Sequence, residues 1–466
     1  MKRTVIAHGT VAADYGVVRA HIVVEGERIA GLTTDDAVLH GADEFVDARG
    51  KVVLPGAIDM HSHFEDLEFT EREDFTTGTM AAAAGGFTTV MEHPLTVPLV
   101  TSAQIFRAKR ERAETKVVVD FGLWGALTRP SLPEIAGQHA EGARGFKAFM
   151  PLSDPEYPHV SDAEFLEGMQ TVAGLGSLVL VHAENDAILR ASLAALRAAG
   201  RTDPLAHHES RPPFVEEEAV HRAIYLARHA GVRLQVVHGS TPETARLVAA
   251  ARGEGQPVTL EVCPHHLLLD LDDLRRLGPY GRCAPPFRDR PLVEALWGRV
   301  LDGTVDSLVS DHAAYTHAEK DAGRDDIFEA PNGCQTIQET VPLVLDEAYH
   351  RRGMTLDHFA RFSATNGARV AGLYPRKGTI LPGGDADLAV YDLDDPWTVD
   401  PAAQQFTKNP WSPFAGRRVR ARLDRTIVRG TSVFADGEIQ VAPGHGRFLH
   451  GREPMTLPDP TMAASR

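Results

Sequence analysis

The feature that most constrains the fold is a regular alternation of short β-rich segments and longer helical segments between about residue 52 and residue 312. The helical segments carry apolar residues at intervals of three and four, a spacing typical of amphipathic helices packed on a sheet. Eight βα units in succession favour an α/β protein built on a TIM-like (β/α)8 barrel. The predicted strands are VVLPGAID (52–59), GFTTVME (86–92), KVVVDFG (116–122), GFKAFM (145–150), SLVLVH (177–182), RLQVVH (233–238), PVTLEV (257–262) and DSLVSD (306–311).

Polar residues with metal-binding side chains stand at the ends of five of these strands. The first strand runs into His61 and His63, whose side chains point to the same face because successive residues of a strand alternate. The carboxyl ends of barrel strands converge on one face, where active sites form. We therefore expect one cluster made of His61, His63, Lys147, His182, His238 and Asp311.

The two ends of the chain have a different pattern. Residues 1–52 and 378–442 contain short alternating segments with turn signals such as EGE, RGT and ADGE, which predict strands and hairpins. We expect these flanks to pair into one small β-sandwich domain beside a barrel domain formed by residues 53–377. Residues 443–466 have no periodicity and are predicted to form an arm or a disordered tail.

Composition limits the partners and the compartment. The formal charge of −16 argues against nucleic acid and anionic membranes, which require a positive surface, and favours a neutral or cationic small molecule. Only three cysteines occur and none forms a CxxC pair, as expected of a reduced protein. No run of about 18 apolar residues and no signal-peptide pattern is present, so a cytoplasmic location is expected.

The predicted cluster is chemically suited to divalent metal ions. Histidine and carboxylate ligands fit Zn²⁺, and four histidines with one aspartate exceed what one catalytic ion uses, so two ions about 3.5–4 Å apart are expected. An ammonium group beside such ions would be repelled, which favours a neutral Lys147. A neutral lysine can combine with carbon dioxide to give a carbamate, which is a carboxylate able to bridge both ions.

The motifs DMHSH, GFKAFM, LVHAEN, VVHGS and SDHAAY, in this order, resemble the cyclic amidohydrolase branch of the amidohydrolase superfamily. This branch includes hydantoinases, dihydropyrimidinases, allantoinases and dihydroorotases, and the resemblance covers about residues 1–440. It implies that His61, His63 and Asp311 surround one ion, that His182 and His238 hold the other, and that a carboxylated Lys147 is shared. It further implies a hydroxide nucleophile between the ions, with Asp311 as the catalytic residue that orients it and carries its proton to the leaving nitrogen. A homotetramer, with a dimer as the alternative, is also expected.

The residues around these motifs bear on the substrate. Dihydroorotase-like sequences have an arginine where this chain has Glu65, and an acidic group would repel dihydroorotate. Leu152 replaces the tyrosine by which hydantoinases bind the substrate carbonyl, and Tyr157 is a candidate substitute. Asn332 and Ala284 match positions at which the backbone contacts the substrate.

The sequence that follows the first predicted strand resembles the corresponding sequence of allantoinases most. The sequence therefore predicts a hydrolase of C–N bonds in cyclic amides that opens a cyclic ureide of the allantoin type. Hydantoins or dihydropyrimidines are the alternative substrates. A scaffold protein without catalytic activity is a remote alternative function. The acidic run at residues 65–74 is a candidate lid.

Most of the 22 histidines are expected to have no catalytic role. Four lie near predicted strand ends and are expected to be polar residues with satisfied hydrogen bonds, with support of the ligands or contact with the substrate as the alternatives: His93, His265, His266 and His312. Another four lie in a helical or loop region and are expected to face solvent: His207, His208, His221 and His229.

Overall fold

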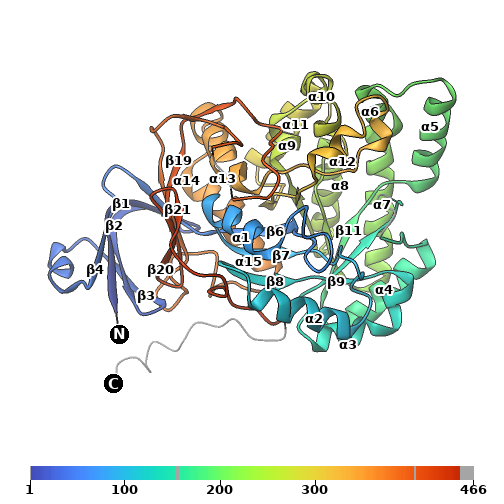
Figure 1. The fold of residues 1–466 in the computed structure, drawn as a ribbon. Coiled ribbons are helices and arrows are strands. Elements are labelled where there is room, and N and C mark those ends of the chain that lie inside the picture. Colours follow the sequence, from blue (N-terminus) through green and yellow to red (C-terminus); the bar gives the residue numbers. More distant parts are fainter. Residues whose placement is uncertain (1, 153–156, 404–405, 452–466) are drawn as a thin grey trace.

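The computed structural model describes residues 2–152, 157–403 and 406–451. Figure 1 shows a β-rich part, which contains β1 to β4 and β19 to β21, beside a larger part in which helices surround parallel strands. The last fifteen residues of the predicted tail, 452–466, lie outside the described residues.

The parallel strands form two sheets. The first has the order β14-β13-β12-β11-β10-β9 and the second contains β15-β6-β7-β8. Each of the eight predicted segments contains one of these strands, and β11 is buried along its whole length, as expected of a strand covered on both faces. The bounds are β6 Ala57–His63, β7 Phe87–Glu92, β8 Asp120–Leu123, β9 Gly125–Ala126, β10 Phe146–Phe149, β11 Leu178–His182, β12 Arg233–Val236, β13 Val258–Val262, β14 Ser307–Leu308 and β15 His312–Ala313.

The first predicted strand is wrong in one respect, because it is two strands that belong to different sheets. Residues Val52–Pro55 form β5, which pairs with strands from both ends of the chain, and β6 begins at Ala57. Gly56 between them lies so close to the sheet that an added Cβ would lie 2.1 Å from Thr88 Cγ2. The change from one sheet to the other therefore falls at Gly56, four residues later than the predicted boundary.

The flanks of the chain form one nine-stranded sheet rather than the two separate sheets of a sandwich. The order is β21-β20-β19-β16-β5-β1-β2-β3, with β4 added beside β1. The sheet curls, since Ile29 of β3 bonds to Gly383 and Gly384 just before β16, and it encloses its own apolar core. The bounds are β1 Arg3–Ala13, β2 Gly16–Glu25, β3 Arg28–Thr33, β4 Glu44–Asp47, β16 Leu388–Asp392, β19 Arg422–Val428, β20 Thr431–Ala435 and β21 Glu438–Ile439. A separate two-stranded ribbon joins β17 Trp397–Thr398 and β18 Arg418–Val419.

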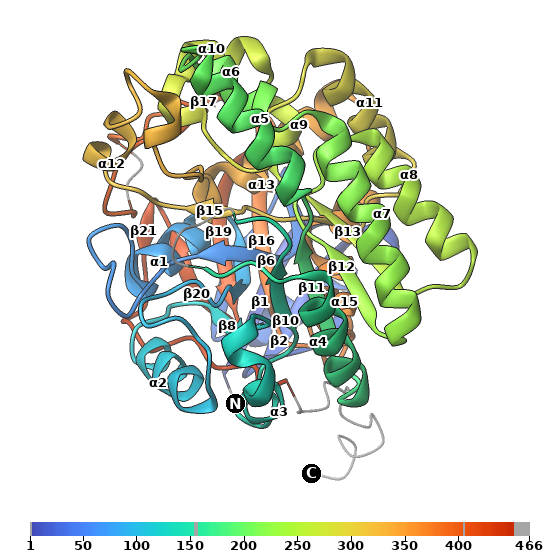
Figure 2. The same ribbon diagram turned by 90° about the vertical axis from the view of Figure 1, so that its right-hand side faces the viewer.

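Helices cover the outer side of the parallel strands, as Figure 2 shows for α4, α7, α8 and α11. Within the described part of the chain, no helix is long and apolar enough to cross a membrane. The bounds are α1 Phe75–Ala84, α2 Ala103–Glu114, α3 Ile135–Ala140, α4 Asp162–Gly174, α5 Asp186–Ala198, α6 Pro204–Ser210, α7 Pro213–Ala230, α8 Pro242–Gly253, α9 Pro264–Leu268, α10 Leu271–Leu277, α11 Arg290–Leu301, α12 His317–Asp321, α13 Ile337–Asp346, α14 Leu356–Ala360 and α15 Asn366–Val370.

Residues 443–451 form an arm that packs against the parallel strands. Phe121 of β8 donates its N–H to the carbonyl of Arg447 and accepts from the N–H of Leu449, at 3.0 and 2.7 Å. The Arg144 guanidinium donates to the carbonyls of Leu449 and His450. These bonds fix the arm across the edge of β8.

Candidate metal centre

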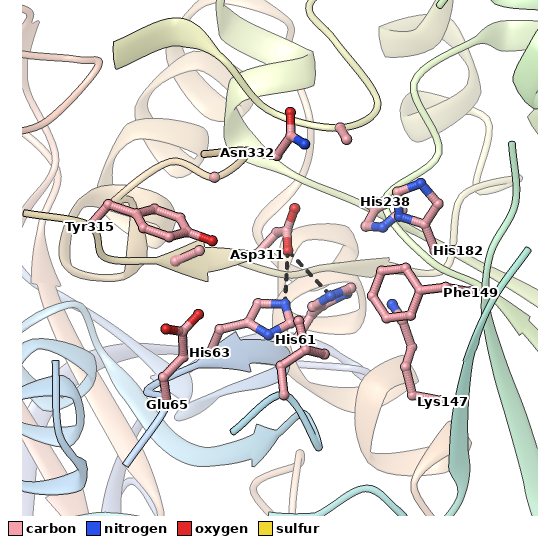
Figure 3. A pocket seen from close by; sticks show the side chains of 14 residues that line it. His61, His63, Glu65, Lys147, Phe149, His182, His238, Asp311, Tyr315 and Asn332 are labelled. Atoms are coloured by element: carbon pink, nitrogen blue, oxygen red, sulfur yellow. Dashed lines mark ion pairs between the residues drawn. The ribbon is translucent and has the colours of Figure 1, made fainter. Parts of the chain in front are cut away.

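The carboxyl ends of the parallel strands surround one cavity with an empty volume of about 500 Å³, open to solvent (Figure 3). Residues from five strand ends reach it, although they are far apart in the sequence. All six predicted ligands line the cavity, as do three of the other predicted site residues: His61, His63, Lys147, His182, His238 and Asp311, with Glu65, Ala284 and Asn332.

The histidine pair and Asp311 form one half of the centre. Asp311 Oδ1 lies 3.2 Å from His61 Nε2 and 3.4 Å from His63 Nε2, as the dashed lines in Figure 3 mark. One ligand atom from each of these residues lies within 4.8 Å of the others. Two imidazole nitrogens and a carboxylate oxygen at this separation can bind one divalent ion.

Lys147 and the other two histidines form the second half. The rings of His182 and His238 pack edge to face with centroids 4.6 Å apart. Lys147 is fully buried, and its Nζ lies 4.7 Å from the centre of the Phe149 ring with no hydrogen-bond partner among the described residues. Burial lowers the pKa of this amine to about 8, so a neutral form is accessible near neutral pH.

Two buried glutamates hold the imidazole rings from behind. Glu261 bonds to His61 Nδ1, and Glu184 lies 2.7 Å from His182 Nε2, so each ring keeps its other nitrogen for a ligand. Burial raises the pKa of Glu261 to about 8. Burial also acts to raise the pKa of Glu184, but Arg211 and His182 outweigh it and bring that pKa to about 2.

Backbone strain is concentrated at the cavity. Glu65, His238 and Asp311 have positive φ angles of 54°, 39° and 48°, a region that residues with a side chain rarely adopt. Six such residues other than glycine occur in the described chain, and half of them line this one cavity. Strain of this kind persists only where the surrounding structure enforces it, which is typical of functional sites.

Two of the predicted site residues lie away from the cavity. Leu152 is exposed, and its N–H donates to Asp186 Oδ1 at 3.1 Å. Tyr157 is buried, but its hydroxyl donates to the main-chain carbonyl of Lys147 at 2.8 Å. Neither is among the lining residues, so Tyr157 supports the backbone that carries Lys147 instead of facing the cavity.

The acidic run at residues 65–74 is largely fixed to the protein. Asp66 is buried and bonds to Lys116 and Arg112 at 2.7 and 3.1 Å. Asp74 caps the first turn of α1 and lies 2.8 Å from Lys408. Only Glu65 of this run lines the cavity.

The structure corrects the expectation of solvent exposure for two of the four histidines, whereas His221 and His229 are exposed as expected. His207 is buried and bonds through Nε2 to the carbonyl of Cys283, at 2.7 Å, next to Ala284. His208 is partly buried and bonds to the carbonyl of Phe287. The four histidines near strand ends are all buried, and the ring of His93 stacks on His61 with centroids 3.9 Å apart. The expectation of satisfied hydrogen bonds is wrong for His93 and His265, whose ring nitrogens have no hydrogen-bond partner among the described residues.

The sequence analysis missed several lining residues: Leu95, Phe149, Ala313, Tyr315 and Gly333. Tyr315 follows Asp311 by four residues and could have been suspected from that position alone. It also missed Arg72, which lies behind the cavity wall and bonds to Glu65 at 2.7 Å.

The sequence profile described as Amidohydrolase family matches residues 52–433. Among similar proteins, an allantoinase of Rubrobacter xylanophilus is 42% identical over 96% of this chain and 96% of its own length. An L-hydantoinase of Paenarthrobacter aurescens is 37% identical over 94% of this chain and 95% of its own length. The solved structure of an L-hydantoinase (dihydropyrimidinase) from Arthrobacter aurescens superposes with a TM-score of 0.94 at 36% identity, over 96% of this chain and 99% of that one.

The arrangement of strands and the cluster of candidate ligands at the strand ends thus define a candidate metal centre on an α/β scaffold. The match over most of its length places the chain in the amidohydrolase family. The resemblance noted in the motifs is confirmed, and the similar proteins include both allantoinases and hydantoinases.

Proposed function

We propose that this protein is a metal-dependent hydrolase that opens the ring of a cyclic amide, with a ureide of the allantoin type as the first candidate substrate. The observation that carries the proposal is the convergence of four histidines, an aspartate and a buried lysine on one cavity. The 42% identity to a protein named allantoinase, along nearly the whole chain, supports this substrate class.

The residues present fit two divalent ions, and Zn²⁺ is our first choice. His61, His63 and Asp311 would hold one ion, and His182 with His238 the other. Three buried polar atoms of the cluster have no hydrogen-bond partner among the described residues: His63 Nδ1, Lys147 Nζ and His238 Nδ1. Such atoms are costly in a protein interior, and a group bound at Lys147 would offset that cost.

Lys147 is suited to become the ligand that both ions share. Its buried amine has a lowered pKa, and the neutral form can add to carbon dioxide, forming an N–C bond and releasing one proton. The resulting carbamate carries the negative charge that the two halves of the centre require. We therefore propose a carboxylated Lys147 as part of the active protein.

When bound, the ions would supply a hydroxide at neutral pH and polarise the ring carbonyl. Asp311 lies where it can take up the proton of the attacking water and return it to the ring nitrogen that leaves. Glu261 and Glu184 keep the imidazoles of His61 and His182 in fixed orientations during these steps. The backbone of Asn332 and Ala284 would hold the ring edge.

A hydantoinase or dihydropyrimidinase activity is the second candidate. The similarity to a solved dihydropyrimidinase from Brevibacillus agri, with a TM-score of 0.89 at 30% identity, favours it. The two candidates share the ring-opening step and differ in the part of the substrate outside the amide. A scaffold without activity is disfavoured because every predicted ligand position is occupied by a competent side chain.

We also infer that the two parallel sheets are the two arcs of one closed barrel. Only Trp124 separates β8 from β9, and its N–H donates to the carbonyl of Glu92. At the other joint, Asp311 donates to the carbonyl of His61 and Val309 to that of Val262. A cytoplasmic homotetramer, with a dimer as the alternative, completes the proposal; the three buried free cysteines suit a reducing compartment.

The proposal is tested on protein purified without chelators. Elemental analysis should find about two equivalents of transition metal per chain, and allantoin, hydantoin or dihydrouracil should be opened. Lys147→Ala should lose metal and turnover, whereas Lys408→Ala, which removes a partly exposed lysine far along the sequence, should keep both. Less than one equivalent of metal, with no ring opening after Zn²⁺ and bicarbonate are added, would overturn the proposal.

A further inference from the structure

Glu65 stands out in the cavity because its acidic side chain is buried, fixed and unused by the metal centre. Its residue is only 5% exposed, and its backbone has the positive φ described above. The N–H groups of Phe64 and Glu65 donate to the Glu92 carboxylate at 3.0 to 3.3 Å, and buried Lys109 lies 3.2 Å from the same carboxylate. A buried ion pair thus holds the strained backbone in place and presents Glu65 to the cavity.

Glu65 forms an ion pair with Arg72. The Arg72 guanidinium bonds to Glu65 Oε2 at 2.7 Å and to Glu319 Oε1 at 2.8 Å. It also packs over the rings of Phe69 and Tyr315, at 4.0 and 4.8 Å from their centres. Two carboxylates share one guanidinium, so the group as a whole keeps a negative charge. Glu65 lines the cavity, whereas Arg72 is not among the lining residues.

The walls of the cavity divide into three parts. The metal-binding residues form one, and the segments that carry Ala284, Asn332 and Gly333 form another. Leu95, Phe149, Ala313 and Tyr315 complete the lining together with Glu65, which Figure 3 shows beside His63 and Tyr315, away from Lys147. Among the described lining residues, Lys147 is the only lysine or arginine, and it belongs to the metal centre.

We propose that Glu65 is the receptor for the ring substituent and that it selects cyclic amides whose substituent donates N–H groups, such as a ureido group. This inference rests on the proposed function and assigns its substrate class to one side chain. A buried carboxylate accepts N–H donors in short, charge-assisted hydrogen bonds. A substituent that carries a carboxylate would be repelled by Glu65, and no lysine or arginine outside the metal centre lines the described cavity to bind it.

The test compares Glu65→Gln and Glu65→Ala with the matched variant Glu68→Gln, which removes an exposed acid from the same segment. Each protein is assayed with allantoin, which has a ureido substituent, with unsubstituted hydantoin and with dihydroorotate, which has a carboxylate. For allantoin, kcat/KM should fall about tenfold in Glu65→Gln and about 100-fold in Glu65→Ala. For hydantoin it should change by less than about threefold, and Glu68→Gln should match the wild type on all three substrates.

For allantoin, the loss should appear as a higher KM, and N-methylurea should be a weaker competitive inhibitor of the Glu65 variants than of the wild type. The metal content of the variants should be unchanged. Glu65→Gln should also lower the ratio of kcat/KM for allantoin to kcat/KM for dihydroorotate. Equal losses on allantoin and hydantoin, or no loss on either, would overturn the role of Glu65 while leaving ring opening intact. If the wild-type protein with its metal opens none of the rings, the proposed function fails first and the inference falls with it.

Discussion

Lys377 Nζ lies 2.7 Å from Asp120 Oδ2, in a buried ion pair that joins the nine-stranded sheet to β8. The same amine contacts Asp385 and Asp387 at 3.1 and 2.6 Å. Asp120 also bonds to Arg429 and to the N–H of Arg447 in the C-terminal arm. Lys377 therefore contacts three buried carboxylates, of which Asp120 also pairs with Arg429 and Asp385 with Arg28 and Arg376, whereas Asp387 pairs with Lys377.

Lys377→Met should lower the free energy of unfolding by about 3–5 kcal/mol, because it leaves the buried carboxylate of Asp387 without its cation and removes one cation from Asp120 and Asp385. Urea denaturation followed by circular dichroism measures the change. Lys2→Met, which removes an exposed partner of Glu44, should cost less than about 1 kcal/mol. A similar small loss for both variants would show that the buried network does not stabilise the junction.

Glu261→Gln should weaken metal binding about 10–100-fold, since the amide cannot hold the His61 ring as the carboxylate does. Competition with a chromogenic chelator measures the affinity without reference to turnover. Glu254→Gln, at an exposed acid after α8, is the control and should bind metal like the wild type. Unchanged affinity in Glu261→Gln would contradict the supporting role assigned to Glu261.

Lys320 should make stability depend on pH. It is fully buried, its amine donates to the carbonyls of Pro331 and Gly333, and burial lowers its pKa to about 8 from 10.5. Between these values the unfolded chain binds more protons than the folded protein, so this group's contribution to stability rises with pH from about 8 to 10. The contribution of Lys320 to the free energy of unfolding is therefore lowest below about pH 8.

The free energy of unfolding of the wild type minus that of Lys320→Met, measured in urea from pH 7 to pH 10, isolates this effect. The difference should grow by up to about 1.4 kcal/mol for each pH unit above 8. A difference that stays constant across this range would mean that the lysine keeps its ordinary pKa. Because Gly333 lines the cavity, the variant should also bind substrate more weakly.

Gly78→Ala should destabilise the protein by about 1–3 kcal/mol through overpacking. A Cβ at Gly78 in α1 would lie 2.3 Å from the ring of Phe64, the residue that follows His63. Gly298→Ala in α11 meets no atom within 4 Å and should stabilise the protein by about 0.5–1 kcal/mol, as alanine favours helix. Thermal unfolding separates the two, and a stable Gly78→Ala protein would show that Phe64 can move aside.

The convergence of the six candidate ligands on one cavity was predictable because strand periodicity and the meeting of parallel strand ends are general rules. His61, His182 and His238 each end an apolar run, so their meeting point followed from the fold class. The split at Gly56 was not predictable, since β5 and β6 form one uninterrupted apolar run and only pairing partners distant in the chain assign them to different sheets.

The residues that were missed depend on contacts between loops. Arg72 reaches Glu65 from seven residues away, and nothing in the acidic run shows which carboxylate it would choose. His207 was expected to face solvent, but it is buried and its ring forms a hydrogen bond with the carbonyl of Cys283. Tyr157 was considered for its hydroxyl, and a main-chain carbonyl takes that hydroxyl instead.

The pairing of β16 with β5 determines when the sheet that precedes β6 can be completed during synthesis. Leu54 pairs with Ala389, and one residue after β5 the chain continues into the strand that carries His61. During synthesis on the ribosome, β5 can therefore pair with β16 only after most of the chain has emerged. Until then β6 follows directly on β5, whose edge lacks its partner β16. The candidate site should therefore form late in folding, and a chaperone that covers the free edge of β5 should raise the yield of folded protein.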